Sequence, residues 1–254
     1  MEQFDYKKLE ILYEDNHIIV VVKPQNIPTQ ADSSNDLDML SVVKDYIVNK
    51  YNKVGDAYVG MVHRLDRPTG GVMVFAKTSK AAQRLCECIK DGTFEKQYLC
   101  VTCGEPKQKK AKLEHYLKKQ EEKNTVIAVP MMTDGAKRAE LDYNVLETIQ
   151  NFSLVKIDLK TGRSHQIRVQ MAAIGCPLFA DAKYGADPKT WKHKMGLWAT
   201  QIRFPHPITK DMMTFICYPP VEEVPWKAFN VSLHLNIGIV VSPYDQYIAK
   251  KDLN

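Results

Sequence analysis

The segment that decides the fold runs from Val62 to Lys77 and reads Val-His-Arg-Leu-Asp-Arg-Pro-Thr-Gly-Gly-Val-Met-Val-Phe-Ala-Lys. Its middle, residues 67–71, contains a proline that fixes its own φ and two glycines that tolerate positive φ, which predicts a tight turn. Residues 72–76 form an apolar run of buried-strand length. The segment therefore predicts a charged loop, a tight turn and a buried strand, with Asp66 beside the turn.

Regular elements are predicted on both sides of this segment. Strands are expected at 9–14 and 18–22 around an Asp-Asn turn, and at 94–103, 139–146, 152–159, 197–203 and 212–218. Helices are expected at 36–51, from 79 to the glycine at 92, and at 164–174, the second capped by Thr78 or Ser79 and the third by Ser164. In the third helix, Ile167, Met171 and Ile174 form the expected buried face. Because strands outnumber helices and β–α–β alternation is scarce, the fold class is α+β with a largely antiparallel sheet.

Composition and charge exclude several classes of protein. With 44% hydrophobic and 26% charged residues in 254, the chain is not disordered, fibrous or a disulfide-stapled miniprotein. The net charge of +5 permits an anionic partner without demanding one. No stretch reaches the roughly 18 apolar residues that span a bilayer, and the N-terminus lacks the apolar region of a signal peptide. A cytoplasmic location is therefore expected.

The six cysteines are too sparse for a disulfide framework, which also favours a reducing compartment. Cys86, Cys88, Cys100 and Cys103 have a spacing that could suggest zinc. A helix would point the first two thiols apart, and a strand would place the last two on opposite sides. Buried thiols are therefore the favoured interpretation, and no metal is expected.

Two charged segments concentrate the candidate site residues. Asp66 lies between two arginines, which favour its ionised form, so it could act as a nucleophile or electrostatic stabiliser, or simply cap the turn. In the second segment, Lys160 to Gln170, a strand, a turn and a helix start bring Arg163, His165 and Arg168 to one corner. That corner suits an anion, whether a phosphate or a buried carboxylate, and Arg168 is the arginine expected to pair with a protein carboxylate.

Two further features have both a structural and a functional interpretation. Tyr98 alternates with Phe94 on the predicted strand 94–103 and would be a buried strand tyrosine unless other residues give it a role. Residues 107–123 contain seven lysines and three glutamates, so they form either a solvated hairpin surface or an arm that contacts phosphates. The sequence contains no HExxH, P-loop, GxGxxG or GxSxG motif, so no cofactor is expected.

The combination of these segments resembles the RluA-type pseudouridine synthase family. The family's HRLD-x-x-T-S-G, K-x-Y, T-G-R-[ST]-H-Q-I-R and P-x-x-G-D-x-x-Y-G motifs are matched by His63 to Gly71, Lys96 to Tyr98, Thr161 to Arg168 and Pro177 to Gly185. The chain departs from the pattern at Gly70, Ala180 and Trp198, where the family has Ser, Gly and His. The resemblance spans about residues 9–222, starts without the S4 domain of many relatives, and leaves 223–254 as a tail of unknown role.

The resemblance implies a fold, a reaction and a set of residue roles. The fold would be the pseudouridine synthase catalytic fold, and the reaction would isomerise uridine in rRNA or tRNA without metal or cofactor. Asp66 would be the catalytic aspartate, Arg168 would pair with it, and Tyr98 would lie against the target base. Arg64 would fill the space left by the flipped uridine or contact its phosphate. The protein is expected to be a monomer that binds an RNA stem-loop.

Two other functions compete with this one. A non-catalytic RNA-binding protein could use the same fold, but it would have little need of Asp66, Tyr98 and Arg168 together. A nucleoside glycosidase would need a second catalytic carboxylate near the first, and no motif supplies one.

Overall fold

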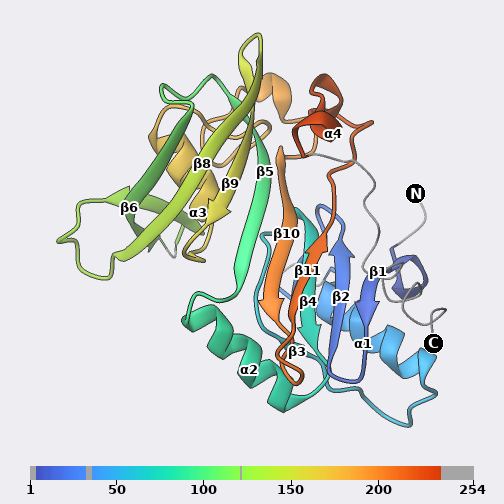
Figure 1. The fold of residues 1–254 in the computed structure, drawn as a ribbon. Helices are drawn as coiled ribbons and strands as arrows, with labels where there is room; N and C mark the ends of the chain where they lie inside the picture. Colours follow the sequence, from blue (N-terminus) through green and yellow to red (C-terminus); the bar gives the residue numbers. More distant parts are fainter. Residues whose placement is uncertain (1–3, 33–35, 121, 236–254) are drawn as a thin grey trace. The chain divides into compact units, whose positions relative to one another are not determined.

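The computed structural model describes residues 4–32, 36–120 and 122–235. They form two compact units, each with its own strands and helices (Figure 1). The first unit comprises the described residues up to 95 together with 201–217, and the second comprises those of 96–200 and 218–235. The strands β5 and β10 therefore each contribute residues to both units.

The first unit is built on a sheet whose strands follow the order β1-β2-β4-β10, with β3 paired to β4 and β11 paired to β10. Every residue of β2 and β4 is buried, as expected for apolar strands at the centre of a sheet. Asp15 closes the predicted turn between β1 and β2 by accepting from the backbone N–H groups of His17 (2.7 Å) and Ile18 (2.8 Å). The strands are β1 (Glu10–Glu14), β2 (Ile18–Lys23), β3 (Gly60–Met61), β4 (Gly70–Ala76), β10 (Leu197–Pro205) and β11 (Met212–Ile216).

Two capped helices, α1 (Met39–Lys50) and α2 (Ser79–Lys90), complete this unit together with the short η1 (Tyr6–Lys8). The Asp38 side chain caps α1 and the Thr78 hydroxyl caps α2, each accepting from a backbone N–H of the first turn. Leu85 of α2 is fully buried in a cluster with apolar residues of β2, β4, β10 and β11. The two helices and the Thr78 cap were predicted from the sequence and are confirmed.

Within the described residues, the sheet of the second unit follows the order β5-β9-β8-β6-β7, and neighbouring strands of this series run antiparallel. Residues 197–200 of β10 also belong to this unit. The helix α3 (Gln166–Ala173) packs on this sheet, with Val169 clustered against apolar side chains of β6, β7 and β8. Gln170 is fully buried and donates to the backbone carbonyls of Leu113 and Ala139, both at 3.3 Å. The strands are β5 (Glu95–Cys103), β6 (Lys110–Gln120), β7 (Thr125–Val129), β8 (Lys137–Ile149) and β9 (Phe152–Leu159).

The start of α3 corrects the prediction. Ser164 is not the N-cap; His165 occupies that position with a left-handed backbone (φ 53°) and makes no side-chain cap. The Gln166 side chain organises the turn instead, since its amide oxygen accepts from the Thr161 hydroxyl (2.7 Å) and the Arg163 N–H (3.0 Å). Ile174, expected to be buried, is partly exposed at the end of the helix.

The C-terminal region returns to the second unit after β11. It forms η3 (Trp226–Ala228) and α4 (Val231–His234), while η2 (Pro188–Thr190) lies earlier in the same unit. Trp226 is only 1% exposed, so the described part of the tail, 223–235, contributes to the core of this unit. The rest of the predicted tail, 236–254, lies outside the described residues.

The strand-rich, mostly antiparallel architecture confirms the α+β fold class. Within the described ranges, no helix has the length and apolar character needed to cross a bilayer.

Candidate active site

Asp66 lies on a turn at the entrance to the buried strand β4. The Thr69 N–H donates to the Asp66 carbonyl at 2.9 Å, so the tight turn spans Asp66–Thr69 and begins one residue earlier than residues 67–71 predicted. Asp66 is half-buried, whereas Arg64 and Arg67 are exposed on either side of it. The turn thus fixes the backbone of the candidate carboxylate and leaves its side chain partly accessible.

Lys23, the last residue of β2, donates hydrogen bonds to the backbone of this turn. Its side chain is fully buried, and its Nζ donates to the carbonyls of Thr69 (2.6 Å), Pro24 (3.0 Å) and Arg67 (3.1 Å). Burial lowers the Lys23 pKa to about 7, and the neighbouring Asp66 carboxylate opposes this shift. A buried lysine therefore interacts electrostatically with the candidate carboxylate.

Thr29 fixes the backbone on the other side of Asp66. Its hydroxyl donates to the Leu65 carbonyl (2.8 Å) and accepts from the Leu65 N–H (3.2 Å). Gln25 and Asn26 add hydrogen bonds to the carbonyls of Pro68 (2.9 Å) and Arg67 (2.8 Å). The segment after β2 thus hydrogen-bonds to the backbone of the Asp66 turn. These contacts join parts of the chain that are far apart in the sequence, so only the structure shows them.

The arginines that flank Asp66 differ in their surroundings. Arg67 pairs with Asp36 and lies 3.9 Å from Asp32. Arg64 is exposed on the loop before the turn, where a side chain can meet a large ligand. The structure therefore places Arg64 and Asp66, both predicted site residues, on one loop of the first unit.

Tyr98 belongs to the second unit, on β5 opposite Ile157 of β9. It is 7% exposed, so it lies at the edge of the core, as predicted for a strand tyrosine. Lys96, two residues earlier on the same side of the strand, is half-buried, and burial lowers its pKa.

Arg168 forms a buried bidentate ion pair in the second unit. It is 5% exposed, and its Nε and Nη2 each donate to one oxygen of the buried Asp181 carboxylate at 2.8 Å. The prediction that Arg168 pairs with a protein carboxylate is confirmed for this unit. Asp181 lies in the segment Pro177 to Gly185, which matches a family motif.

Tyr184 links Arg168 to the start of α3. The Arg168 guanidinium carbon lies 5.0 Å from the centre of the Tyr184 ring, a cation–π distance. The Tyr184 hydroxyl lies 2.6 Å from His165 Nδ1 and accepts from the Val126 N–H at 2.9 Å. Arg163 is exposed and its Nε donates to the Arg138 carbonyl at 3.0 Å. Of the predicted corner, His165 and Arg168 therefore meet at Tyr184, whereas Arg163 contacts β8 through the Arg138 carbonyl.

Ala180 departs from the family pattern at a position that favours glycine. Its φ is 58°, in the left-handed region where a Cβ is unfavourable, and its N–H donates to the Thr190 hydroxyl at 3.2 Å. The backbone conformation at position 180 thus explains why the family motif has glycine there, because this position forms the turn that leads into Asp181.

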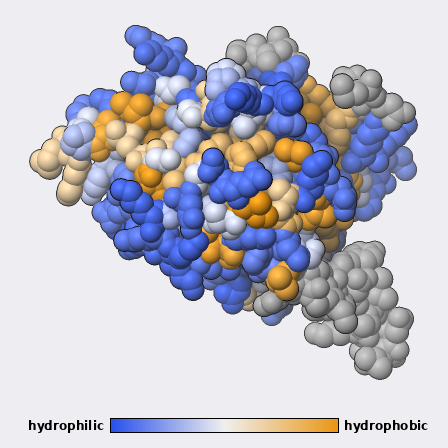
Figure 2. Space-filling view, turned by 90° about the horizontal axis from the view of Figure 1, so that it is seen from above, coloured by the Kyte–Doolittle hydropathy of each residue, from blue (hydrophilic) through white to orange (hydrophobic). Residues whose placement is uncertain are grey.

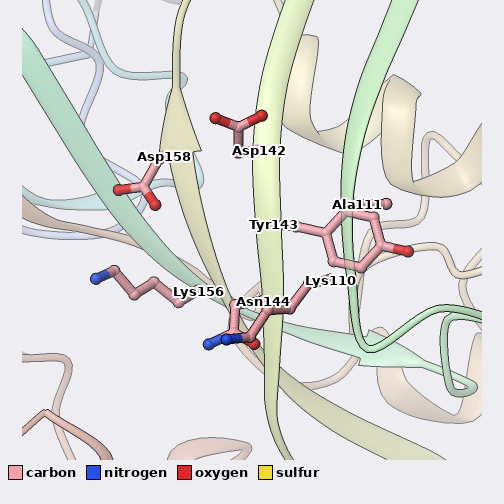
Figure 3. A pocket seen from close by; sticks show the side chains of 7 residues that line it. All are labelled: Lys110, Ala111, Asp142, Tyr143, Asn144, Lys156 and Asp158. Atoms are coloured by element: carbon pink, nitrogen blue, oxygen red, sulfur yellow. The ribbon is translucent and has the colours of Figure 1, made fainter.

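The lysines of residues 107–123 lie on and around β6, and hydrophilic side chains dominate the surface seen in Figure 2. Lys109 pairs with Glu105 and Lys112 pairs with Glu140. Lys107 and Lys110 have no ion pair within the described part of the chain. Lys110 lines a shallow groove on the sheet with Lys156 and Asn144, and the carboxylates of Asp142 and Asp158 lie toward its other end (Figure 3).

None of five cysteines is in a disulfide within the described residues. Cys86, Cys88, Cys100, Cys103 and Cys176 are free, and burial raises the pKa of Cys100 well above its usual value. Among the described residues, no group of three His, Cys, Asp or Glu side chains gathers in a metal-binding arrangement.

Comparison with known proteins identifies the family. The family described as RNA pseudouridylate synthase matches residues 17–173, which include Asp66, Tyr98 and Arg168. A ribosomal large subunit pseudouridine synthase D of Pasteurella multocida is 30% identical over 85% of this chain and 69% of the relative. Its counterpart in Yersinia pestis is 33% identical with the same coverage, and an uncharacterized RNA pseudouridine synthase of Bacillus subtilis is 31% identical over 88% of this chain and 70% of the relative.

Solved structures agree with the fold. Human RNA pseudouridylate synthase domain containing 4 superposes with a TM-score of 0.70 at 22% identity, covering 83% of this chain and 88% of that one. Domain containing 1 gives the same score and identity and covers 87% of each chain. The resemblance drawn from the sequence motifs is confirmed: the chain belongs to the RNA pseudouridylate synthase family, in its RluA-type branch, and is an isomerase that acts on RNA.

Proposed function

We propose that this enzyme isomerises specific uridines of structured RNA with Asp66 as its catalytic carboxylate. The observation that carries the proposal is the half-buried Asp66 on a turn fixed by Lys23 and Thr29. Isomerisation breaks the C1′–N1 bond of uridine and forms a C1′–C5 bond, so positive charge develops at C1′ as the first bond weakens. A carboxylate held rigidly beside C1′ can stabilise or capture that charge.

The other predicted residues have complementary roles in this scheme. Arg168 serves as the catalytic arginine that favours the ionised form of the carboxylate during turnover, and Tyr98 lies against the uracil ring and helps to remove the C5 proton. Arg64 contacts the RNA where the uridine leaves its stack. Arg163 and His165 bind phosphate near the start of α3. The flipped uridine costs a few kcal/mol of unstacking, which favours a target in a loop and is offset by phosphate contacts.

The substrate is proposed to be ribosomal RNA rather than transfer RNA, since the similar proteins of Pasteurella and Yersinia are named for the ribosomal large subunit. No electron or external group is transferred, so the reaction requires neither metal nor cofactor. We place the catalytic domain at residues 9–222, with the described part of the tail, 223–235, packed into its second unit, in a single, monomeric chain. The free thiols are consistent with a cytoplasmic location.

The Asp66→Asn variant tests the role of the carboxylate. It should abolish tritium release from C5-labelled uridine in ribosomal RNA, because the amide cannot stabilise charge at C1′. Its RNA affinity should stay within about threefold of the wild type, because phosphate contacts dominate affinity.

Asp45→Asn is the matched control, because Asp45 is exposed on α1 of the same unit. It should release tritium at the wild-type rate. Normal release by Asp66→Asn would remove Asp66 from its role. A wild-type protein that binds RNA but releases no tritium from any RNA would instead indicate the non-catalytic RNA-binding function.

A further inference from the structure

The second unit buries a charged pair that its core does not require. Arg168 is 5% exposed and Asp181 is 1% exposed, and the two share a bidentate contact of 2.8 Å on each side. Burying two charges costs desolvation energy, and apolar residues of similar volume often stabilise a core at least as well. What such a pair provides is geometry, since a bidentate contact fixes the plane and rotation of the guanidinium.

The geometry of this pair has a defined direction. Asp181 binds the edge of the guanidinium formed by Nε and Nη2. Nη1 therefore lies on the side of the guanidinium away from Asp181, and the direction of its N–H groups is set by the Asp181 pair. The Asp181 Oδ1 also accepts from the Lys183 N–H at 3.2 Å, so the carboxylate itself is held by its own loop.

Tyr184 holds the same guanidinium from its face. The centre of its ring lies 5.0 Å from the Arg168 guanidinium carbon. Its hydroxyl contacts β7 through the Val126 N–H (2.9 Å) and the start of α3 through His165 Nδ1 (2.6 Å). A phenylalanine would keep the ring and lose both contacts. Tyr184 therefore connects the lysine-rich hairpin formed by β6 and β7 to Arg168.

We infer that Asp181 and Tyr184 are positioning residues for Arg168: Asp181 fixes the rotation of the guanidinium, and Tyr184 locks it to strand β7 and to the start of α3. The inference rests on the proposed role of Arg168 in catalysis and adds the two residues that act through it. Neither residue needs to touch the RNA for this role.

The test is a double-mutant cycle on turnover, with kcat and KM measured from tritium release. Tyr184→Phe should lower kcat about tenfold and change KM less than about twofold, and Asp181→Asn should lower kcat about a hundredfold, since small misplacements of a catalytic group have effects of this size. Arg168→Lys should also lower kcat. In the Arg168→Lys background, Tyr184→Phe should change kcat less than about twofold, because its effect passes through the guanidinium.

Tyr143→Phe is the matched control for Tyr184→Phe. Tyr143 is a buried tyrosine of the same unit whose hydroxyl donates to the Gln108 carbonyl at 3.0 Å, so its variant loses a comparable hydrogen bond. It should retain wild-type kcat, and its loss of stability in urea unfolding should match that of Tyr184→Phe. If Asp181→Asn does not fold, the Tyr184→Phe cycle decides alone.

The outcomes separate this inference from the proposed function. A tenfold loss that persists unchanged in the Arg168→Lys background, or a Tyr184→Phe variant as fast as Tyr143→Phe, would overturn the inference while Asp66→Asn remains inactive. A fully active Arg168→Lys variant would contradict the proposed role of Arg168, and the positioning role would be overturned with it.

Discussion

At the scale of single residues, Lys23 fixes the backbone of the Asp66 turn at a cost in folding stability. A buried ammonium is unfavourable, yet its three N–H donors match three carbonyl oxygens at 2.6–3.1 Å. Two of these carbonyls belong to Arg67 and Thr69, directly after Asp66. The lysine therefore connects the end of β2 to the turn that carries the proposed carboxylate, and it adds positive charge beneath it.

The pH dependence of stability tests this burial. In the folded protein the Lys23 pKa is lowered from 10.5 to about 7. Between these two pH values the unfolded chain binds more protons than the folded chain, so folding becomes more favourable as pH rises. From pH 7 to 9 the wild type should gain about 2 kcal/mol of unfolding free energy relative to Lys23→Met, at no more than about 1.4 kcal/mol per pH unit.

The measurement is urea unfolding of both proteins at pH 6, 7, 8 and 9. Lys53→Met, at an exposed lysine, is the control and should differ from the wild type by the same amount at every pH. A pH-independent difference between wild type and Lys23→Met would show that the lysine has the same protonation in the folded and unfolded states.

Single residues also show how far the sequence could predict this site. Asp66 and Arg168 could be named from local chemistry, because charged residues beside a turn or a helix start are unusual in themselves. Lys23 could not, since its partner Arg67 is 44 residues away in the chain, and its role depends on β2 lying beside β4. Asp181, the partner of Arg168, could not be named from the sequence either. It follows a turn at Ala180 that requires a left-handed residue, and the chain has alanine there.

At the scale of elements, the prediction succeeded where the determining interaction is local. The cap of α2 lies within one turn of its helix, so the residue types alone identify it. The start of α3 depends on Gln166 Nε2, which donates to the Glu140 carbonyl at 3.0 Å, a contact across 26 residues. Local capping rules therefore predicted Ser164 as the N-cap of α3, whereas the contact with β8 places the N-cap at His165.

The lysines around β6 give a prediction for an element. Lys109 and Lys112 are paired with Glu105 and Glu140, whereas Lys107 and Lys110 have no ion pair within the described ranges. Neutralising all four should weaken RNA binding and flatten its salt dependence. The Lys107→Gln, Lys110→Gln double variant should account for most of the change, about 0.7 in the slope of log K against log salt for each lost phosphate contact.

The measurement is fluorescence anisotropy of a ribosomal RNA stem-loop between 50 and 200 mM salt (roughly the range in which phosphate contacts dominate). The Lys109→Gln, Lys112→Gln variant is the matched control and should change the slope less, because its ammonium groups already have carboxylate partners. A slope unaltered in the fourfold variant would make these lysines a solvated surface.

At the scale of the whole molecule, the chain path distributes the second unit over two distant segments. Residues 96–200 are joined by 218–235, after the chain has visited the first unit through the rest of β10 and β11. The C-terminal segment contacts β8 through Glu147, which accepts from the Asn230 N–H at 3.1 Å and lies 3.0 Å from the His234 ring. This short segment has no periodic hydrophobic pattern, so its contribution could not be predicted.

Trp226 is the residue by which that segment should stabilise the second unit. It is 1% exposed, so Trp226→Ala should lower the unfolding free energy by about 3–5 kcal/mol through lost burial and a cavity. Trp191 and Trp198 also belong to this unit, so their fluorescence during urea unfolding reports its stability in the variant. Trp191→Ala, at a residue 50% exposed whose indole donates to the Ala186 carbonyl, should cost only about 1 kcal/mol. A loss of no more than about 1 kcal/mol in Trp226→Ala would mean that the C-terminal segment contributes little to the stability of the second unit.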